Sequence, residues 1–269
     1  MNTYNKIVKL IKQNKTSDAI SLIEDNHNLN EQIDKETGNN LLHVACLYNR
    51  DDVAKFIFCK KTASQINDKS MTPLYYCVMN NNESLCYYFI HNGIKPDKET
   101  LFSASRSASP NIIKILFIRK IEFNITDHRK QNMLIHAIKQ KRSYTIIDYL
   151  SNKCDLNQVD IYMNTPMHYA CRCLRAGYEK ILTLLTKKGA DIIQRNNDGN
   201  SSIDYIKSFE LKLNIINITR KYARFYRRRG FLMFLAQYKF LESNHNYDSP
   251  IAAKVFNMKE MYRHIMFYL

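Results

Sequence analysis

Three histidines and three cysteines are the residues of this chain whose types and spacing could support a chemical function. The candidates for a general base are His43, His136 and His168, and the candidates for metal ligands are Cys154, Cys171 and Cys173. No P-loop, Gly-x-Gly-x-x-Gly or His-Glu-x-x-His sequence accompanies them, and no Ser/His/Asp or Cys/His grouping has a recognisable spacing. Two residues apart on a helix, Cys171 and Cys173 would point to different sides. We therefore predict no catalytic residue, no cofactor and no metal.

The composition indicates a folded chain of 269 residues, with 45% hydrophobic and 24% charged residues, which excludes a wholly disordered protein. No apolar run approaches the roughly 18 to 20 residues of a membrane span. The first fifteen residues intersperse lysines among single apolar residues, unlike a secretory signal. The seven cysteines are odd in number and lack Cys-x-x-Cys spacing. We expect an intracellular, cytoplasmic protein, with the nucleus as the alternative compartment.

The net charge of +15 is not evenly spread along the chain. From Lys207 onward there are 12 basic and four acidic residues, a net charge of +8, while the first 206 residues carry +7. Such a shift in composition marks a boundary. We predict one domain over residues 1–206 and a basic helical C-terminal extension over residues 207–269.

The elements that position the histidines are repeated segments. Four stretches follow one template: Gly38 to Ala45, Met71 to Cys77, Gln131 to Ala137 and Asn164 to Ala170. Their leucine-equivalent positions are Leu42, Leu74, Leu134 and Met167, and Leu101 divides the long interval between the second and third of these. The spacings correspond to a period of about 33 residues.

Each period contains signals for two helices. Thr72-Pro73 and Thr165-Pro166 suit the N-cap and first position of a first helix. Apolar residues at helical spacing then predict a second helix in five places: Val53/Phe56/Ile57, Leu85/Phe89/Ile90, Ile112/Ile115/Leu116, Ile146/Ile147/Leu150 and Ile181/Leu184/Leu185. Gly93 and Gly189 stand where such a helix ends in a left-handed conformation. Residues 4–30 read as an earlier helix pair, an N-terminal cap.

The chain resembles the ankyrin-repeat family. Asn164 to Ala170 followed by Leu184 to Asp191 nearly matches the family signature, and Asp198 to Asp204 reads as the start of a last repeat. The resemblance implies an all-α ankyrin-repeat solenoid of helix-turn-helix repeats with β-turn or hairpin connections. It implies about six helix pairs, including the cap, with residues 97–124 the most degraded unit. His43 and His168 fall on the family's structural histidine, which bonds turn and backbone groups, and His136 lies one residue beyond it.

The resemblance also implies a binding surface at the turn tips and the ends of the first helices. On this register its residues are Thr37, Leu47, Tyr48, Lys69, Met79, Asn80, Arg106, Arg129, Lys139, Gln140, Tyr162 and Arg172. The N-terminal end of this concave surface would be apolar and aromatic, and its C-terminal half basic. We expect a non-enzymatic, monomeric scaffold whose partner is a protein with an exposed hydrophobic anchor beside an acidic patch.

The C-terminal extension leaves alternatives open. Arg227, Arg228 and Arg229 lie among aromatic residues, a pattern of RNA-binding, anionic-surface or nuclear-import segments. The interpretation that we favour is a capping helix whose apolar stripe covers the last repeat.

Residues 249–269 carry an apolar stripe at Met258, Met261, Ile265 and Leu269. This segment is faintly similar to the opening of an F-box, as in the shortened F-box-like (PRANC-like) module of some ankyrin proteins. That similarity implies an alternative function as a ubiquitin-ligase substrate adaptor, whereas the simpler interpretation is an amphipathic helix packed on the domain.

Overall fold

The computed structural model describes residues 3–26, 33–118, 125–173 and 178–226, the last five of these by their backbone alone. The chain divides into two compact units. The first comprises residues 1–127 and 132–154, and the second residues 128–131 and 155–269. Within the described ranges regular β-strands are absent, and the loops carry isolated antiparallel bridges, Ile33 to Asn40 and Arg195 to Ser201. The expectation of an all-α repeat fold is confirmed.

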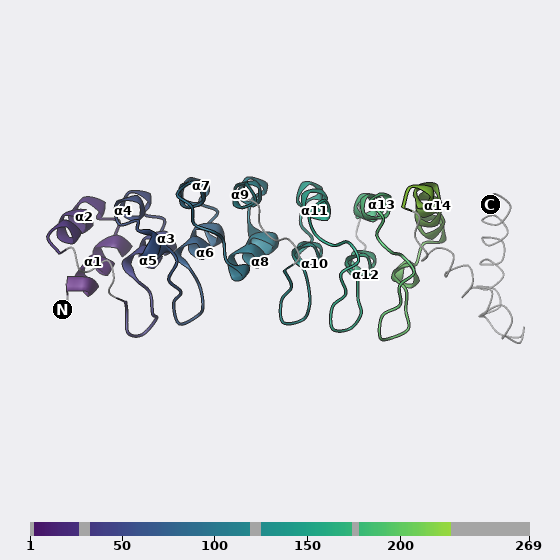
Figure 1. The fold of residues 1–269 in the computed structure, drawn as a ribbon, viewed down its shortest axis with the longest axis horizontal. Coiled ribbons are helices and arrows are strands. Elements are labelled where there is room, and N and C mark those ends of the chain that lie inside the picture. Colours follow the sequence, from purple (N-terminus) through teal and green to yellow (C-terminus); the bar gives the residue numbers. More distant parts are fainter. Residues whose placement is uncertain (1–2, 27–32, 119–124, 174–177, 227–269) are drawn as a thin grey trace, which may run out of the picture. The chain divides into compact units, whose positions relative to one another are not determined.

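The first unit is built from successive helix pairs (Figure 1). Its helices are α1 (Thr3–Lys12), α2 (Thr16–Glu24), α3 (Leu41–Leu47), α4 (Asp51–Phe56), α5 (Lys60–Ala63), α6 (Pro73–Met79), α7 (Glu83–His91), α8 (Lys98–Ser107), α9 (Pro110–Leu116), α10 (Met133–Lys139) and α11 (Tyr144–Ser151). The first helices of the pairs, α1, α3, α6, α8 and α10, contact one another in that order. The second helices, α2, α4, α7, α9 and α11, form a parallel row.

The core of the first unit lies between these two rows. Leu42, Leu74 and Leu134 from the first helices and Val53 and Leu85 from the second are buried. A single short helix pair cannot bury its apolar face by itself, so its stability comes from burial of that face against the neighbouring pairs. The predicted N-terminal cap, α1 and α2, buries Ile7, Ile11 and Ile23 in the same way.

The second unit continues the pattern with α12 (Pro166–Arg172), α13 (Glu179–Lys187), the 3₁₀ helix η2 (Ser202–Tyr205) and α14 (Phe209–Tyr226). α12 contacts α13 and η2, and α13 contacts α14. Thus η2 stands in the place of a first helix and α14 in the place of a second. None of the described helices of either unit combines the length and apolar composition that a membrane span needs.

The loops follow strict backbone rules. Each long loop carries a left-handed residue two positions before the N-cap of the next first helix: Gly38, Ser70, Lys130, Met163 and Gly199. Gly93 and Gly189, with φ of 93° and 89°, end α7 and α13 as predicted. Within each unit the long loops project on one side, opposite the second helices (Figure 1).

The third repeat departs from the template. Only residues 92–97 connect α7 to α8, whereas residues 188–201 connect α13 to η2. α8 also begins early, since Leu101 is its fourth residue while Leu74 is the second residue of α6. α4 forms where the spacing of Val53, Phe56 and Ile57 predicted a helix, but Phe56 is 47% exposed, because α4 ends at this residue and the chain turns toward α5.

Candidate protein-binding surface

His43 is part of a helix cap and not a general base. The side-chain oxygen of Asn40 accepts the backbone N–H of His43, and the imidazole Nδ1 of His43 accepts the backbone N–H of Asn40 at 3.2 Å. Because Nδ1 accepts, the proton is on Nε2, which donates to the carbonyl oxygen of Met71 at 3.0 Å. Burial lowers the pKa of His43 to about 4, so the ring is neutral.

His168 has the same role in the second unit. Its Nδ1 accepts the backbone N–H of Thr165 at 3.1 Å, and its Nε2 lies 3.2 Å from the carbonyl oxygen of Asn200. Its pKa is also lowered by burial. Thr165 caps α12 as predicted. The structural role that the resemblance implied for both histidines is therefore visible in the bonds that they make.

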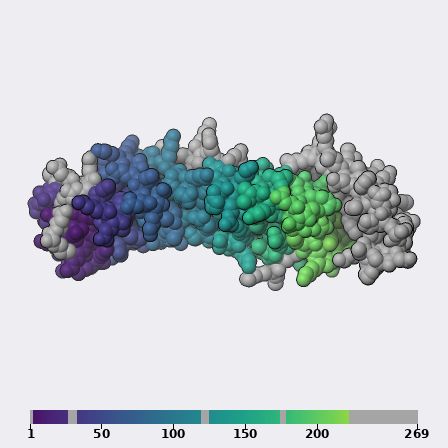
Figure 2. All heavy atoms as spheres, turned by 90° about the horizontal axis from the view of Figure 1, so that it is seen from below, coloured from purple at the N-terminus to yellow at the C-terminus, as the bar shows by residue number. Residues whose placement is uncertain are grey.

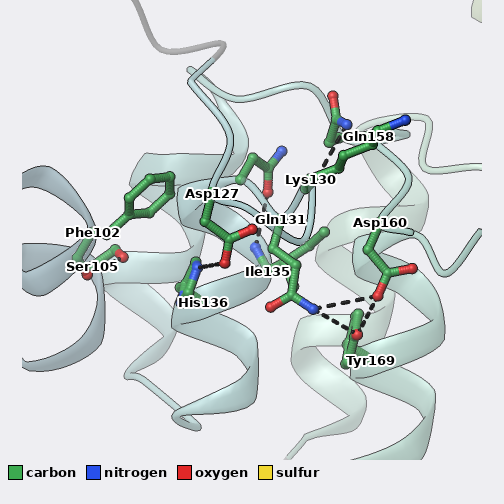
Figure 3. Close-up of polar contacts among 11 residues, drawn as sticks. Phe102, Ser105, Asp127, Lys130, Gln131, Ile135, His136, Gln158, Asp160 and Tyr169 are labelled. Atoms are coloured by element: carbon green, nitrogen blue, oxygen red, sulfur yellow. Dashed lines mark hydrogen bonds and ion pairs between the residues drawn. The ribbon is translucent and has the colours of Figure 1, made fainter. Parts of the chain in front are cut away.

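His136 occupies a different repeated position, nine residues after an acid or amide near the start of the long loop, a pairing found in four of the described loops. Its Nε2 lies 3.0 Å from the Asp127 carboxylate, and its ring packs 4.9 Å from that of Phe102 (Figure 3). Burial lowers its pKa, and Asp127 opposes that shift. The same nine-residue pairing joins Asn67 to Tyr76, Asp160 to Tyr169 and Asn196 to Tyr205. His136 is thus a histidine in a tyrosine position of the fold.

Asp160 shows what this position does for the loop. One carboxylate oxygen accepts the backbone N–H groups of Tyr162 and Asn164, and the other accepts the Tyr169 hydroxyl at 2.6 Å and the Gln131 amide at 3.3 Å (Figure 3). Burial, followed by the hydrogen bond to Asp160, raises the pKa of Tyr169. The Asp160 carboxylate thus accepts four hydrogen bonds, which join its own loop to α12 and to Gln131 and hold the loop in place.

The cysteines do not form a metal site in the described part of the chain. No group of three or more His, Cys, Asp or Glu side chains there has the proximity to hold a metal ion. Cys171 is buried, and burial raises the pKa of its thiol to about 12. A thiol with such a pKa stays protonated at neutral pH and is a poor ligand and a poor nucleophile.

The predicted first-helix residues lie along adjacent helices of the first unit. We define the first-helix strip as Leu47 and Tyr48 at the end of α3, Met79 at the end of α6, Arg106 in α8 and Lys139 at the end of α10. Leu47 and Met79 are 38% and 47% exposed, and the other three are half-buried. The Ser103 hydroxyl contacts the Met79 sulfur at 3.0 Å, and Arg142 donates to the Arg106 carbonyl oxygen, which ties neighbouring helices together along the strip.

Asn80 and Gln140 are exposed beside the strip, but Asn80 has a structural task as well. Its side-chain amide donates to the carbonyl oxygens of Cys46 and Leu47, at 3.1 and 2.9 Å, and so satisfies the end of α3. Sequence reasoning also missed a neighbour: the Lys12 ammonium lies 5.8 Å from the centre of the Tyr48 ring. The spacing of residues in the sequence carries no signal for that tertiary contact.

The predicted loop-tip residues share one backbone position, three residues before the N-cap. Thr37, Lys69, Arg129 and Tyr162 are all exposed there. In the first unit the carbonyl oxygen of Thr37 accepts the N–H of Asp68. In the second unit those of Arg129 and Tyr162 accept the N–H groups of Ile161 and Asn197. Figure 2 shows the first unit from the side onto which its loops project.

Two further apolar residues lie beside Tyr162 at the tip of its loop. Ile161 and Met163 are also exposed. Three consecutive large apolar or aromatic residues in a turn are a sequence signal for an exposed apolar tip, but only Tyr162 was predicted to lie on the binding surface. Arg172, at the end of α12, is exposed, and its guanidinium lies 5.1 Å from the centre of the Tyr205 ring.

The basic extension is described only as far as α14. Leu211, Ile215 and Ile216 of α14 are buried, and α14 packs on α13. Arg227, Arg228 and Arg229 and the F-box-like residues 249–269 lie outside the described residues, so the RNA-binding and ligase-adaptor hypotheses, and the domain boundary at residue 207, stay predictions.

The chain belongs to the ankyrin-repeat family. The family model for ankyrin repeats (3 copies) matches it twice, over residues 2–100 and 101–196. Ankyrin repeats are general protein–protein interaction modules and are not, as a rule, enzymes.

Solved structures of ankyrin repeat domains share this fold. That of human ASB11 is 18% identical with a TM-score of 0.65, and the match covers 79% of this chain and 96% of that chain. That of Bcl-3, described as a unique member of the IkappaB protein family, is 14% identical with a TM-score of 0.62, covering 78% and 97%. A domain from Acinetobacter baumannii AYE is 19% identical with a TM-score of 0.58, covering 66% and 95%.

Proposed function

We propose that this chain is a protein-binding scaffold whose partner docks on the first-helix strip. The observation that carries the proposal is the exposure of Leu47 and Met79 beside the aromatic ring of Tyr48 on adjacent helices. Large apolar and aromatic side chains grouped on a surface are the usual anchors of a protein interface. The side chains of Leu47 and Met79 remain exposed after the repeats have packed.

The charges around this apolar part favour an acidic partner. Lys12 lies at one end, and Arg106 and Lys139 at the other. The carboxylates that follow the first helices are engaged in the connections between repeats: Asp51 accepts from Asn82 at 2.6 Å, and Glu83 accepts from Ser109 at 2.8 Å. We therefore infer a partner with an exposed apolar anchor between or beside acidic residues.

The partner is first isolated by affinity purification on the tagged chain, from the cells in which this protein is naturally made. Two double variants are then compared for binding to that partner. Tyr48→Ala with Met79→Ala should raise the Kd at least about tenfold, because truncated interface anchors typically cost more than 1 kcal/mol each. The control is Phe56→Ala with Tyr87→Ala, which removes two exposed aromatic side chains from the second helices α4 and α7. The control should bind like the unchanged protein.

Both variants should keep the melting temperature, since every substituted side chain is at least partly exposed. Affinity should also fall as salt is raised from about 0.05 M to about 0.5 M, because screening weakens attraction between an acidic partner and this surface. Undiminished binding by Tyr48→Ala with Met79→Ala would refute the proposed surface.

A further inference from the structure

The third repeat interrupts a ladder of backbone bonds that the other loops maintain. Within the first unit the N–H of Asp68 donates to the carbonyl oxygen of Thr37 at 3.2 Å. Within the second unit the N–H of Ile161 donates to the carbonyl of Arg129 at 3.1 Å, and that of Asn197 to the carbonyl of Tyr162 at 3.0 Å. Each acceptor lies three residues before an N-cap, so this position is built to receive a backbone donor from the next loop.

Lys69 is the residue at this position in the second loop of the first unit, three residues before Thr72. Its carbonyl oxygen accepts no hydrogen bond from any described residue. The cause is the shortened connection of residues 92–97, which runs directly into α8 and forms no projecting loop. The repeated acceptor is present, whereas the connection to α8 is too short to form the loop that would carry its donor.

The start of α8 has been repacked to close this shorter path. Thr72, which is the N-cap residue of α6, makes no side-chain cap bond to its own helix. Its hydroxyl donates instead to the Asp97 carboxylate at 2.6 Å, and the other oxygen of Asp97 accepts the N–H of Thr100. α6 and α8 are thus joined at their first residues. The second loop is bonded to the preceding loop through Asp68 and Thr37, and on its other side, toward the third repeat, no described loop bonds to its backbone.

The charges near this acceptor are mainly positive. Lys69, three residues before Thr72, and Lys98, next to Asp97 in the sequence, are both exposed, and the Lys98 ammonium lies 6.0 Å from the centre of the Phe102 ring. The Asp97 carboxylate is engaged, and that of Asp68 lies on the opposite side of its loop, against Gly38. The exposed carboxylate of Glu99 remains to oppose the two lysines.

We propose that this open loop edge, defined by the Lys69 carbonyl with the side chains of Lys69 and Lys98, docks an extended segment of a partner protein that carries a carboxylate. The segment donates a backbone N–H to the Lys69 carbonyl, as the missing loop would have done, and its acid pairs with the lysines. Unpaired backbone edges are recognised in this way when a peptide adds to the edge of a sheet. The surface is separate from the first-helix strip.

The probe is a phage-displayed library of disulfide-closed nine-residue loops, selected on the full chain, with the recovered loops then synthesised. Lysine labelled with ¹³C at the carbonyl and serine labelled with ¹⁵N give signals from two peptide bonds, Lys69–Ser70 and Lys207–Ser208. Acidic loops that bind should move the first signal and leave the second unchanged.

The variant Lys69→Glu with Lys98→Glu should weaken these loops at least about tenfold, since like charges then face each other. Lys35, in the preceding loop, is also exposed, and Lys35→Glu should leave their affinity unchanged. The proposal is overturned if no selected loop moves the Lys69–Ser70 signal, or if the double variant binds normally. The proposal is also overturned if the selected peptides lose affinity when Tyr48 and Met79 are replaced, a result that would instead support binding at the first-helix strip.

Discussion

The imidazole of His43 donates to the carbonyl oxygen of Met71, 28 residues later in the chain and in the next repeat, at 3.0 Å. Its other nitrogen accepts the N–H of Asn40, so one neutral ring joins the start of its own helix to the following loop. His168 makes the equivalent pair of bonds to Thr165 and Asn200 in the second unit. A protonated ring would lose its acceptor and carry a charge into a buried site.

Stability should therefore decrease in mild acid. The pKa of His43 is about 4 in the folded chain and 6.5 in the unfolded chain. As the pH falls, His43 is therefore protonated in the unfolded chain before it is protonated in the folded chain. The free energy of unfolding should fall as the pH drops from 6.5 to 4 and be unaffected by this group at lower pH, with a total of about 3 kcal/mol. The lowered pKa of His168 acts in the same direction. Urea denaturation across this range measures the slope, and His43→Gln should flatten it; an unchanged slope in that variant would contradict this assignment.

Substitutions of Asp160 should separate the shape of its network from its charge. Asp160→Ala removes the acceptor of four hydrogen bonds and should lower the free energy of unfolding by about 3 kcal/mol. Asp160→Asn should cost less than about 1 kcal/mol, because Asn67 and Asn196 fill the equivalent position and donate to their tyrosines. Chemical denaturation of both variants checks the order, and equal losses would show that the charge, not the geometry, is what the loop requires.

Two loop glycines should differ in their tolerance of alanine. Both have positive φ, 67° at Gly38 and 77° at Gly199. A Cβ on Gly38 would lie 2.8 Å from the backbone nitrogen of Asp68, whereas a Cβ on Gly199 would meet nothing within 4 Å. Gly199→Ala should cost about 1 kcal/mol from backbone strain alone, and Gly38→Ala clearly more. The melting temperatures of the two variants are compared. Equal decreases would mean that the backbone near Asp68 moves to accommodate the added Cβ, and would contradict the prediction.

Asn80 and Met79, adjacent at the end of α6, should respond differently to truncation. Asn80→Ala leaves the carbonyl oxygens of Cys46 and Leu47 without their donor and should lower stability by about 1 to 2 kcal/mol. Met79→Ala should leave stability within about 0.5 kcal/mol, since its side chain is half exposed. Thermal unfolding of the two single variants is the measurement. Comparable losses would indicate that Met79 is a packing residue and weaken its assignment to the first-helix strip.

The fold was predictable because its signals are local and repeated. Thr165 with Pro166 begins a helix wherever the sequence places it, and the period of about 33 residues places the next helix pair. The nine-residue pairing of Asp127 with His136 was also present in the sequence, as Asn67 with Tyr76 and Asn196 with Tyr205 show, but a histidine among tyrosines concealed it.

The remaining features depend on tertiary structure. Thr72 has the sequence of a helix cap, yet its hydroxyl bonds to Asp97, which the short connection between α7 and α8 brings within reach. Phe56 has the spacing of a core residue, yet α4 stops at that position. Which exposed residues receive a partner is not encoded by the repeat template, since the template specifies only what the repeats need for their own packing.

The direction of the histidine bonds bears on how the chain is made. In both units the acceptor for the ring lies downstream, so a repeat leaving the ribosome lacks its last bond until roughly thirty more residues have emerged. In a nascent chain arrested before Asn200, the Nε2–H of His168 would lack the Asn200 carbonyl oxygen as its hydrogen-bond acceptor. The repeats that contain His43 and His168 can therefore gain this bond only after the following loop has been translated, and a synonymous change that slows elongation there should prolong the time without it.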